Sequence, residues 1–266
     1  MSEISLAQQK FLLSQKKHRQ IVTISRLCIF VLFFGLWEGA AQLNLIDSFF
    51  FSSPSRVIIC AYDMLLDHTL FTHIGVTLFE TIASFILVTV LALVATIILW
   101  LNKKISETLE PYLVILNSLP KSALAPLLIV WFGANYNTII ITGISVAIFG
   151  SILSLYTSFQ SVDAEKIKLV QTLGGKKYHI LTKVVLPANI PALFAVMKVN
   201  IGLCLVGVII GEFISSREGL GYLIIYGSQV FKLDWVVMSI VILCLLAWGL
   251  YSLLTRLEKR YLKRMS

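Results

Sequence analysis

Long runs of apolar residues alternate with short polar segments along most of this sequence. Two of the runs, Thr138–Phe159 and Trp235–Leu254, contain no charged residue. A helix needs roughly 20 apolar residues to cross the hydrocarbon core of a bilayer. Both runs have that length, and we therefore predict that each forms a membrane-spanning helix.

Four further apolar runs reach a spanning length and contain one or two charged residues each. Three of them are predicted to be continuous spans: Leu27–Ile46, Leu78–Leu101 and Ile190–Ile214. The fourth, Tyr112–Phe132, contains Pro120 and Pro126, and a proline removes a backbone donor and clashes with the preceding turn. Such backbone is tolerated in a bilayer only where neighbouring groups satisfy it. We therefore expect this span to be bent or interrupted between the two prolines and to face the protein interior.

The composition agrees with this pattern and excludes two other classes of protein. Of the 266 residues, 58% are apolar and 14% are charged, and the mean hydropathy is +0.87. An ordinary soluble domain has about 25% charged residues, so this chain has too little polar surface for a soluble enzyme. Disordered chains are poor in apolar residues. We predict an all-α integral membrane protein with six transmembrane helices.

The basic residues are distributed unevenly between the two sides that six spans define. Seventeen of the 22 Lys and Arg residues lie in the two tails, around Asn102 and in the loop 160–189, and three lie in segments on the opposite side. The positive-inside rule then predicts that both termini are cytoplasmic. The domain organisation is a cytoplasmic tail 1–26, a spanning domain 27–256 and a cytoplasmic tail 257–266. The first tail could be a helix on the membrane surface or a solvated tail.

A short amphipathic helix is predicted on the outer side, between the first two spans. Ser53-Pro54-Ser55 is typical of a helix start. Apolar residues then follow at helical spacing until the segment ends before Thr69.

Residue types that carry catalysis or bind metals show no arrangement typical of a site. The four cysteines form no C-x-x-C, and the four histidines lack metal-ligand spacing. We find no paired carboxylates or histidine cluster converging within the spans, which argues against a membrane enzyme. A G-x-x-x-x-G-K-[ST] loop is also absent. We expect no catalytic residue, metal or cofactor on this chain, and contact with lipid rather than nucleic acid.

The loop 160–189 is too long to be a simple turn between spans. Asp163 can cap a first helix that continues to Thr172, and Gly174 can end that helix in the left-handed conformation. A second helix is predicted over Lys177–Val185 and ends near Leu186-Pro187. Each short helix has one apolar face, which needs either a protein partner or the membrane surface. The pattern alone does not separate these two possibilities.

Several motifs now resemble a known family. Gly174, nine intervening residues, Val184, one residue and Leu186-Pro187 match the G-x9-[IV]-x-L-P part of the loop signature of ABC importer permease subunits. Lys168-Leu169-Val170 stands where that signature begins with an acidic residue and two alanines. The agreement extends to five other segments: Pro126-Leu127, Trp131-Phe132-Gly133, Ser161-Val162-Asp163, Glu212-Phe213-Ile214 and Glu218–Ile224. The set resembles the nitrate, sulfonate, taurine and bicarbonate branch, and permeases for thiamine-pyrimidine precursors are similar in the same regions.

This resemblance implies a type I ABC importer permease fold in a bacterial plasma membrane. It implies a dimer of ATPase subunits that bind ATP and Mg, an extracytoplasmic substrate-binding protein, and a second permease chain, which we expect to be another copy of this one. The expected substrate is a small anion such as a sulfonate, nitrate or bicarbonate. A thiamine-pyrimidine precursor or another small organic nutrient is the alternative. A secondary transporter is a distant alternative, because no inverted halves are seen.

The resemblance also assigns the loop 160–189 to coupling with the ATPase. The residues expected to make that contact are Lys168, Leu169, Val170, Leu173, Gly174, Gly175, Lys176, Tyr178, His179, Leu186 and Pro187.

Candidate pathway residues come from two spans. In the third span, Lys121 lies between Pro120 and Ser122, and irregular backbone at membrane depth tends to line cavities. In the fifth span the candidates are Asn200, Gly207, Gly211 and Glu212. Glu212 could line a pathway, reach water at the interface or pair with Arg217. The small residues of that span could equally allow close helix approach.

Overall fold

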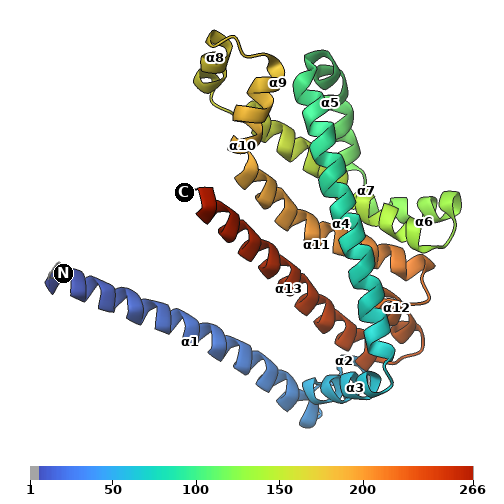
Figure 1. The fold of residues 1–266 in the computed structure, drawn as a ribbon. Helices are drawn as coiled ribbons and strands as arrows, with labels where there is room; N and C mark the ends of the chain where they lie inside the picture. The colour runs from blue at the N-terminus through green and yellow to red at the C-terminus, as the bar shows by residue number, and fades with distance from the viewer. Residues whose placement is uncertain (1–5, 266) are drawn as a thin grey trace. The chain divides into compact units, whose positions relative to one another are not determined.

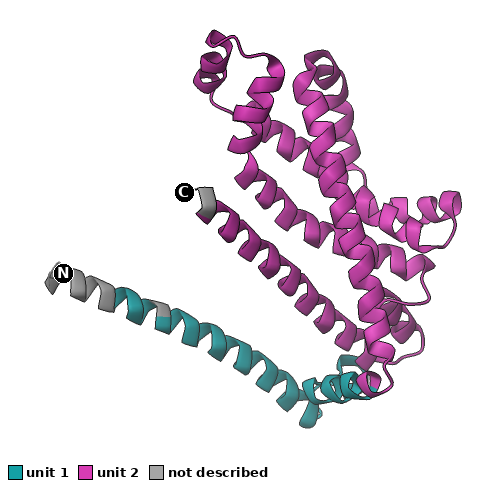
Figure 2. Cartoon of the chain, viewed as in Figure 1, with its two compact units in different colours: residues 1–63 teal, residues 64–266 magenta. Residues whose placement is uncertain are grey.

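The computed structural model describes residues 6–265, and every regular element in that part of the chain is helical. The chain divides into two compact units, residues 1–63 and residues 64–266 (Figure 2).

Unit 1 is built on one long helix, α1 (Leu6–Gln42), of which Ser14–Gln42 is long and apolar enough to span a membrane. The predicted first span therefore begins earlier in the structure and is continuous with residues 6–26 of the tail. Residues 1–5 of that tail lie outside the described residues.

Two short helices follow α1, namely α2 (Ser48–Phe51) and α3 (Pro54–Leu66), whose start lies in unit 1. The carboxylate of Glu38, near the end of α1, accepts hydrogen bonds from the backbone N–H and the hydroxyl of Ser55 at 3.0 and 2.9 Å. A carboxylate is favourable at a helix amino end because it meets unsatisfied N–H groups there. Glu38 therefore fixes the start of α3, and the structure confirms that the segment predicted before Thr69 is helical.

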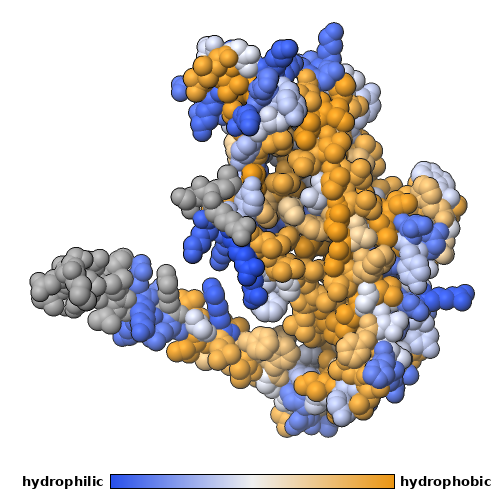
Figure 3. All heavy atoms as spheres, viewed as in Figure 1, coloured by the Kyte–Doolittle hydropathy of each residue, from blue (hydrophilic) through white to orange (hydrophobic). Residues whose placement is uncertain are grey.

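Four helices of unit 2 are long and apolar enough to cross a membrane: α4 (Thr69–Leu101), α7 (Tyr136–Gln160), α11 (Ile190–Ser215) and α13 (Leu233–Met265). Figure 1 shows them side by side, with α8 and α9 beyond one end of α4 and α12 at its other end. We call the end of unit 2 near α8 and α9 the loop end, and the end near α12 the pocket end. Along α4 the visible surface of unit 2 is hydrophobic, and hydrophilic side chains gather around α8 and α9 (Figure 3).

The predicted third span is a bent pair of helices, α5 (Lys103–Ser118) and α6 (Lys121–Phe132), which meet at 96°. The break lies at Leu119-Pro120, before the interval between the prolines where we expected it, and Pro126 is inside α6. Leu119 is extended, with φ −62° and ψ 141°, because a residue before proline is disfavoured in the helical region. Five spanning helices are thus present in the described chain, or six when the bent pair is counted as one span.

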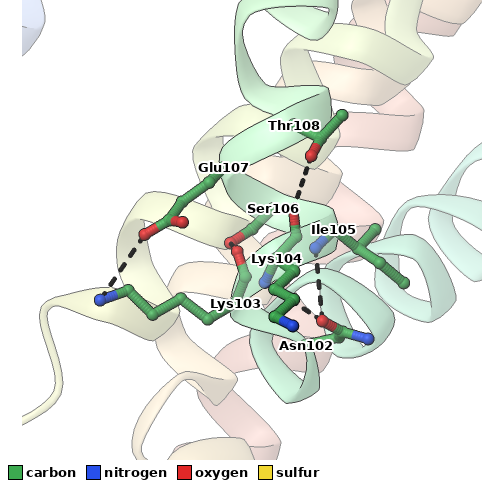
Figure 4. A network of polar contacts seen from close by, with 7 residues as sticks. All are labelled: Asn102, Lys103, Lys104, Ile105, Ser106, Glu107 and Thr108. Atoms are coloured by element: carbon green, nitrogen blue, oxygen red, sulfur yellow. Dashed lines mark hydrogen bonds and ion pairs between the residues drawn. The ribbon is translucent and has the colours of Figure 1, made fainter.

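A single residue, Asn102, separates α4 from α5. Its side-chain oxygen accepts the N–H groups of Lys104 and Ile105 at 3.1 and 3.3 Å, and Lys103 pairs with Glu107 one turn on at 3.6 Å (Figure 4). These are the bonds of a helix amino end. The chain therefore ends one helix and begins the next without a loop.

The core of unit 2 lies where α4, α7 and α11 pack together. Val88, Ala147 and Cys204, one from each helix, are fully buried there. The backbones of α7 and α11 approach so closely that a Cβ on Gly207 would lie 2.8 Å from the Cα of Gly143. Small residues permit this approach, so in this structure Gly207 serves helix packing.

Candidate functional site

The first helix of the loop is α8 (Ala164–Thr172), as the sequence predicts. Asp163 caps it, because its carboxylate accepts the N–H of Glu165 at 2.9 Å. Gly174 has φ +78°, and the N–H of Gly175 donates to the carbonyl of Val170 at 2.8 Å. This left-handed residue reverses the chain and confirms the predicted helix end.

The second helical segment continues further than expected. It runs through α9 (Lys177–Ile180), a π-helical turn η1 (Leu181–Val185) and α10 (Leu186–Ala188), and α11 follows. We expected an end near Leu186-Pro187. Proline has no N–H and clashes with the carbonyl four residues earlier, and in the wider turn the N–H of Leu186 bonds instead to the carbonyl of Leu181. The chain therefore accommodates Pro187 without leaving the helical conformation.

One face of the loop is packed on the spans and the other is exposed. Ile180, Leu181 and Val185 are buried with Phe159 of α7. By contrast, Leu173 is 79% exposed and Tyr178 is 67% exposed. Large apolar side chains at the polar loop end form a surface that a protein partner could cover. Of the other residues assigned to coupling, Lys168, Leu169, Gly174, Lys176 and His179 are exposed, and Val170, Gly175, Leu186 and Pro187 are half-buried. Val170 and Leu186 pack against the buried cluster instead of contributing to the exposed surface.

Two polar contacts fix the orientation of this surface. The ring Nδ1 of His179 accepts the N–H of Lys176 at 3.1 Å and so caps α9. The ammonium of Lys177 donates to the carbonyl of Leu101 at 3.4 Å, at the carboxyl end of α4, where a cation is favourable. The loop is therefore bonded directly to a spanning helix. The contact of these residues with an ATPase stays a prediction.

The pathway candidates of the fifth span are buried in the interior of unit 2. The amide oxygen of Asn200 accepts the hydroxyl of Ser151 of α7 at 2.6 Å, and a Cβ on Gly211 would lie 3.1 Å from Ile139. With Gly207 and Glu212, these residues join α11 to α4 and α7 in this structure. Their role in a pathway stays a prediction.

Glu212 is at the centre of a polar network that the sequence does not reveal. Its Oε1 accepts the hydroxyl of Thr77 of α4 at 2.6 Å, and its Oε2 accepts the N–H of Gly221 at 2.5 Å. Among the described residues Glu212 forms no ion pair with Arg217, which was one of the alternatives left open by the sequence, and Glu212 is 0% exposed. Glu212 therefore neither reaches water nor forms an ion pair in this structure.

The same network binds the start of α12 (Leu220–Gln229). The N–H of Leu220 donates to Thr77 Oγ1 at 2.8 Å, and the N–H of Gly219 donates to His73 Nδ1 at 3.0 Å. His73 and Thr77 are one turn apart on α4, and Glu80 is buried on the same side. Glu80 lies beside Glu212, so the expectation that no carboxylates converge within the spans is wrong. Polar residues at positions 73, 77, 80, 81 and 84 were the available signal in the sequence.

Beside this network is a pocket of about 520 Å³ at the pocket end. Its wall on α4 includes His73, and its wall on α12 includes Tyr222 and Tyr226, whose rings stack with centroids 5.5 Å apart. Arg217 and Glu218 contribute charge. The pocket therefore has an aromatic wall whose position depends on the first turn of α12.

The candidates of the third span lie at the amino end of α6. Pro120 and Ser122 are exposed, and Lys121 is half-buried. Within residues 6–265, Lys121 makes no hydrogen bond or ion pair with another side chain. Ala125 is buried, whereas Val130 and Trp131 are exposed in the single chain, so the expected interior position is seen for part of α6.

The described chain thus combines five or six possible membrane spans with a helical loop that is bonded to a spanning helix. The family described as "Binding-protein-dependent transport system inner membrane component" matches residues 88–266, and this chain belongs to that family. It is therefore a permease subunit of an ABC importer.

Two relatives carry names with different substrates. SsuC of Bacillus subtilis, named for the transport of aliphatic sulfonates, is 24% identical over 229 residues, which cover 86% of this chain and 83% of SsuC. ThiX of Halalkalibacterium halodurans, named a formylaminopyrimidine transport permease, is 24% identical over 193 residues, which cover 73% of this chain and 76% of ThiX.

A solved structure has the same fold. An inward-facing conformation of the MetNI methionine ABC transporter matches with a TM-score of 0.62 and 18% identity, over 76% of this chain and 98% of that chain. At this identity the likeness establishes the type I importer fold and leaves the substrate open.

Proposed function

We propose that this permease moves a small anion such as a sulfonate, nitrate or bicarbonate across the bacterial plasma membrane, and that a separate ATPase dimer drives it through the loop 160–189. The observation that carries the coupling role is the exposed apolar surface formed by Leu169, Leu173 and Tyr178 at the loop end. The bond from Lys177 to the end of α4 supports it, because a partner docked there would act on a spanning helix.

The coupling role is tested with Leu173→Asp in the assembled transporter. Burying a leucine side chain contributes about 1.5–3 kcal/mol, so we expect at least about a tenfold loss of ATPase binding. Substrate uptake should fall with it, and insertion of the permease should persist. Leu66→Asp is the control, since Leu66 is an exposed leucine on α3. Normal ATPase co-purification with the Leu173 variant would contradict the proposal.

The preference for an anion rests on Lys121. Its ammonium forms no ion pair with the described residues, and the amino end of α6 adds partial positive charge at the same place. An anion could therefore be held by both. The SsuC name agrees with this choice and the ThiX name does not.

The substrate class is tested in proteoliposomes that hold the transporter and its binding protein. Removing one charge-assisted hydrogen bond costs about 1.5–3 kcal/mol, so Lys121→Gln should reduce anion uptake about tenfold or more, and Lys121→Arg should restore it. Lys104→Gln, at an exposed lysine of α5, is the control. The anion proposal would be overturned if Lys121→Gln left uptake unchanged and the binding protein bound formylaminopyrimidine. That result would favour the alternative substrate.

The second permease chain is proposed to be another copy of this one, with the pathway between the two copies. Val199, Val206 and Ile214 form an exposed apolar stripe on α11, opposite its buried face. A two-fold axis along this stripe would bring identical residues together. Single cysteines at these positions, in a variant without the native cysteines, should therefore crosslink chain to identical chain. No such crosslink, together with a different permease co-purifying one to one, would indicate a heterodimer.

A further inference from the structure

Two acidic side chains meet inside unit 2. Glu80 of α4 and Glu212 of α11 are both 0% exposed, and their carboxyl groups lie beside one another. A buried ionised carboxylate needs an opposite charge or several hydrogen-bond donors. Neither carboxyl forms an ion pair with a basic side chain in the described residues. Donors and protons must therefore account for the arrangement.

Glu212 has the donors that an ionised carboxylate needs. It accepts the hydroxyl of Thr77 at 2.6 Å and the N–H of Gly221 at 2.5 Å. Gly221 belongs to the first turn of α12, and the amino end of a helix carries partial positive charge. The negative charge of Glu212 is therefore stabilised where it lies.

Glu80 has none of these donors. Across the part of the chain that the structure describes, neither of its carboxyl oxygens receives a hydrogen bond. Its polar neighbour is the carboxylate of Glu212. Two adjacent negative charges repel each other strongly when water is excluded. A proton on Glu80 would remove the repulsion and supply the missing donor.

We infer that Glu80 carries a proton and donates it in a hydrogen bond to the ionised Glu212, so that the two carboxyl groups form a latch between α4, α11 and the start of α12. This proton site is independent of which substrate is carried. It makes Glu80 and Glu212 positioning residues rather than residues that touch the cargo.

The latch fixes one wall of the pocket at the pocket end. Three consecutive N–H groups at the start of α12, those of Gly219, Leu220 and Gly221, are bound by His73, Thr77 and Glu212 respectively. The aromatic wall of the pocket begins directly after them, at Tyr222. If the charge of Glu212 were no longer stabilised, the first turn of α12 would lose this bond. The aromatic wall that follows the turn would then lose its fixed position.

The proton is tested directly by infrared difference spectroscopy on the assembled transporter in lipid nanodiscs. A protonated carboxyl has a carbonyl stretch that a carboxylate lacks. We expect the wild-type spectrum to contain such a band, and we expect Glu80→Gln to remove it. Glu110→Gln, at an exposed glutamate of α5, is the matched control and should keep the band.

The latch is tested separately by the contrast between two substitutions of Glu80. Glutamine reproduces both the neutral charge and the donor of a protonated glutamate, so Glu80→Gln should keep uptake and thermal stability within about twofold of the wild type. Glu80→Ala leaves Glu212 without that donor, and a lost partner of a buried charge should lower the folded fraction or the uptake by about tenfold or more. Glu212→Gln should behave like Glu80→Ala, because glutamine keeps only one of the two acceptor oxygens that Glu212 uses and its NH₂ group would face a donor.

Two results would overturn the inference. One is a wild-type spectrum without the carbonyl band, combined with a Glu80→Gln variant as defective as Glu80→Ala. The other is a wild-type stability that rises with added Na⁺ or K⁺ and a Glu80→Gln variant that loses this response, because a metal cation would then occupy the place of the proton.

Discussion

Gly219 and Gly221 are the two residues at which the packing around Glu212 leaves no room for a side chain. Gly219 has φ +104°, and a Cβ there would collide with the carboxylate of Glu212. A Cβ on Gly221 would lie 2.7 Å from Glu212 Oε2. The carboxylate therefore occupies space that exists only because both residues are glycine.

Substituting these glycines should destabilise the permease. We expect Gly219→Ala and Gly221→Ala each to lower the free energy of unfolding by more than about 1 kcal/mol, through backbone strain at the first and overpacking at both. The measurement is the thermal stability of the solubilised chain. Gly249→Ala is the control, because a Cβ at Gly249 in α13 meets nothing within 4 Å. Equal stability of all three variants would contradict the packing described here.

Gly174 gives a second prediction at this scale, because its φ of +78° excludes β-branched residues while its surroundings are open. Gly174→Val should cost about 1 kcal/mol or more locally and should reduce ATPase co-purification and transport while membrane insertion persists. Gly174→Asn is the matched control, since asparagine tolerates the left-handed conformation. A Val variant that assembles as well as the Asn variant would argue against a required turn.

The sequence singles out residues whose chemistry is unusual for their surroundings. Lys121 and Glu212 stand out as charges within apolar spans, and their pathway roles stay predictions. Gly174 stands out between two amphipathic segments, and the structure confirms its left-handed turn. The partners of Glu212 could not be predicted, because Thr77 is 135 residues away in the chain. That pairing depends on how α4, α11 and α12 pack, which hydrophobic periodicity does not specify.

At the scale of elements, the crossing of α7 and α11 depends on one pair of glycines. A side chain at Gly207 would meet the backbone of Gly143 and Thr142 at 2.8 and 3.0 Å. Backbone atoms cannot move aside as a flexible side chain can. The two helices would have to separate.

Gly207→Val should therefore separate these helices and destabilise unit 2 by about 1–3 kcal/mol or more. Gly202→Val on the same helix α11 is the matched control, because a Cβ at Gly202 meets nothing within 4 Å. Thermal stability in detergent distinguishes the two variants. Equal loss in both would mean that helix propensity, rather than the crossing, determines the effect.

The two predictions based on prolines show that the sequence locates a disturbed helix but not the exact position or form of the disturbance. A break in the third span was predicted, and it occurs, but at Leu119-Pro120 rather than between the prolines. An end at Pro187 was also predicted, yet the chain continues through the π-helical turn Leu181–Val185. Proline predicts local disturbance of a helix, and packing decides whether the disturbance becomes a bend or a wider turn.

At the scale of the whole molecule, the distribution of basic residues predicts the orientation in the membrane. We expect single cysteines at Lys16 and Lys263, in a variant without the native cysteines, to react with a membrane-impermeant maleimide only after the cells are permeabilised. A cysteine at Arg56 should react in intact cells, because the positive-inside rule places that residue outside. Labelling of either terminal position in intact cells would contradict the orientation.

One helix is bonded to other segments at both of its ends. At the loop end Leu101 of α4 accepts the bond from Lys177, and at the pocket end His73 and Thr77 accept the N–H groups that begin α12. The 33 residues of α4 give it a length of about 50 Å, and a helix resists compression along its axis because every turn is hydrogen-bonded to the next. A displacement of Leu101 imposed through Lys177 would therefore be transmitted along α4 to His73 and Thr77, and through them to the start of α12. The two ends of α4 would then move together without any rearrangement inside the helix.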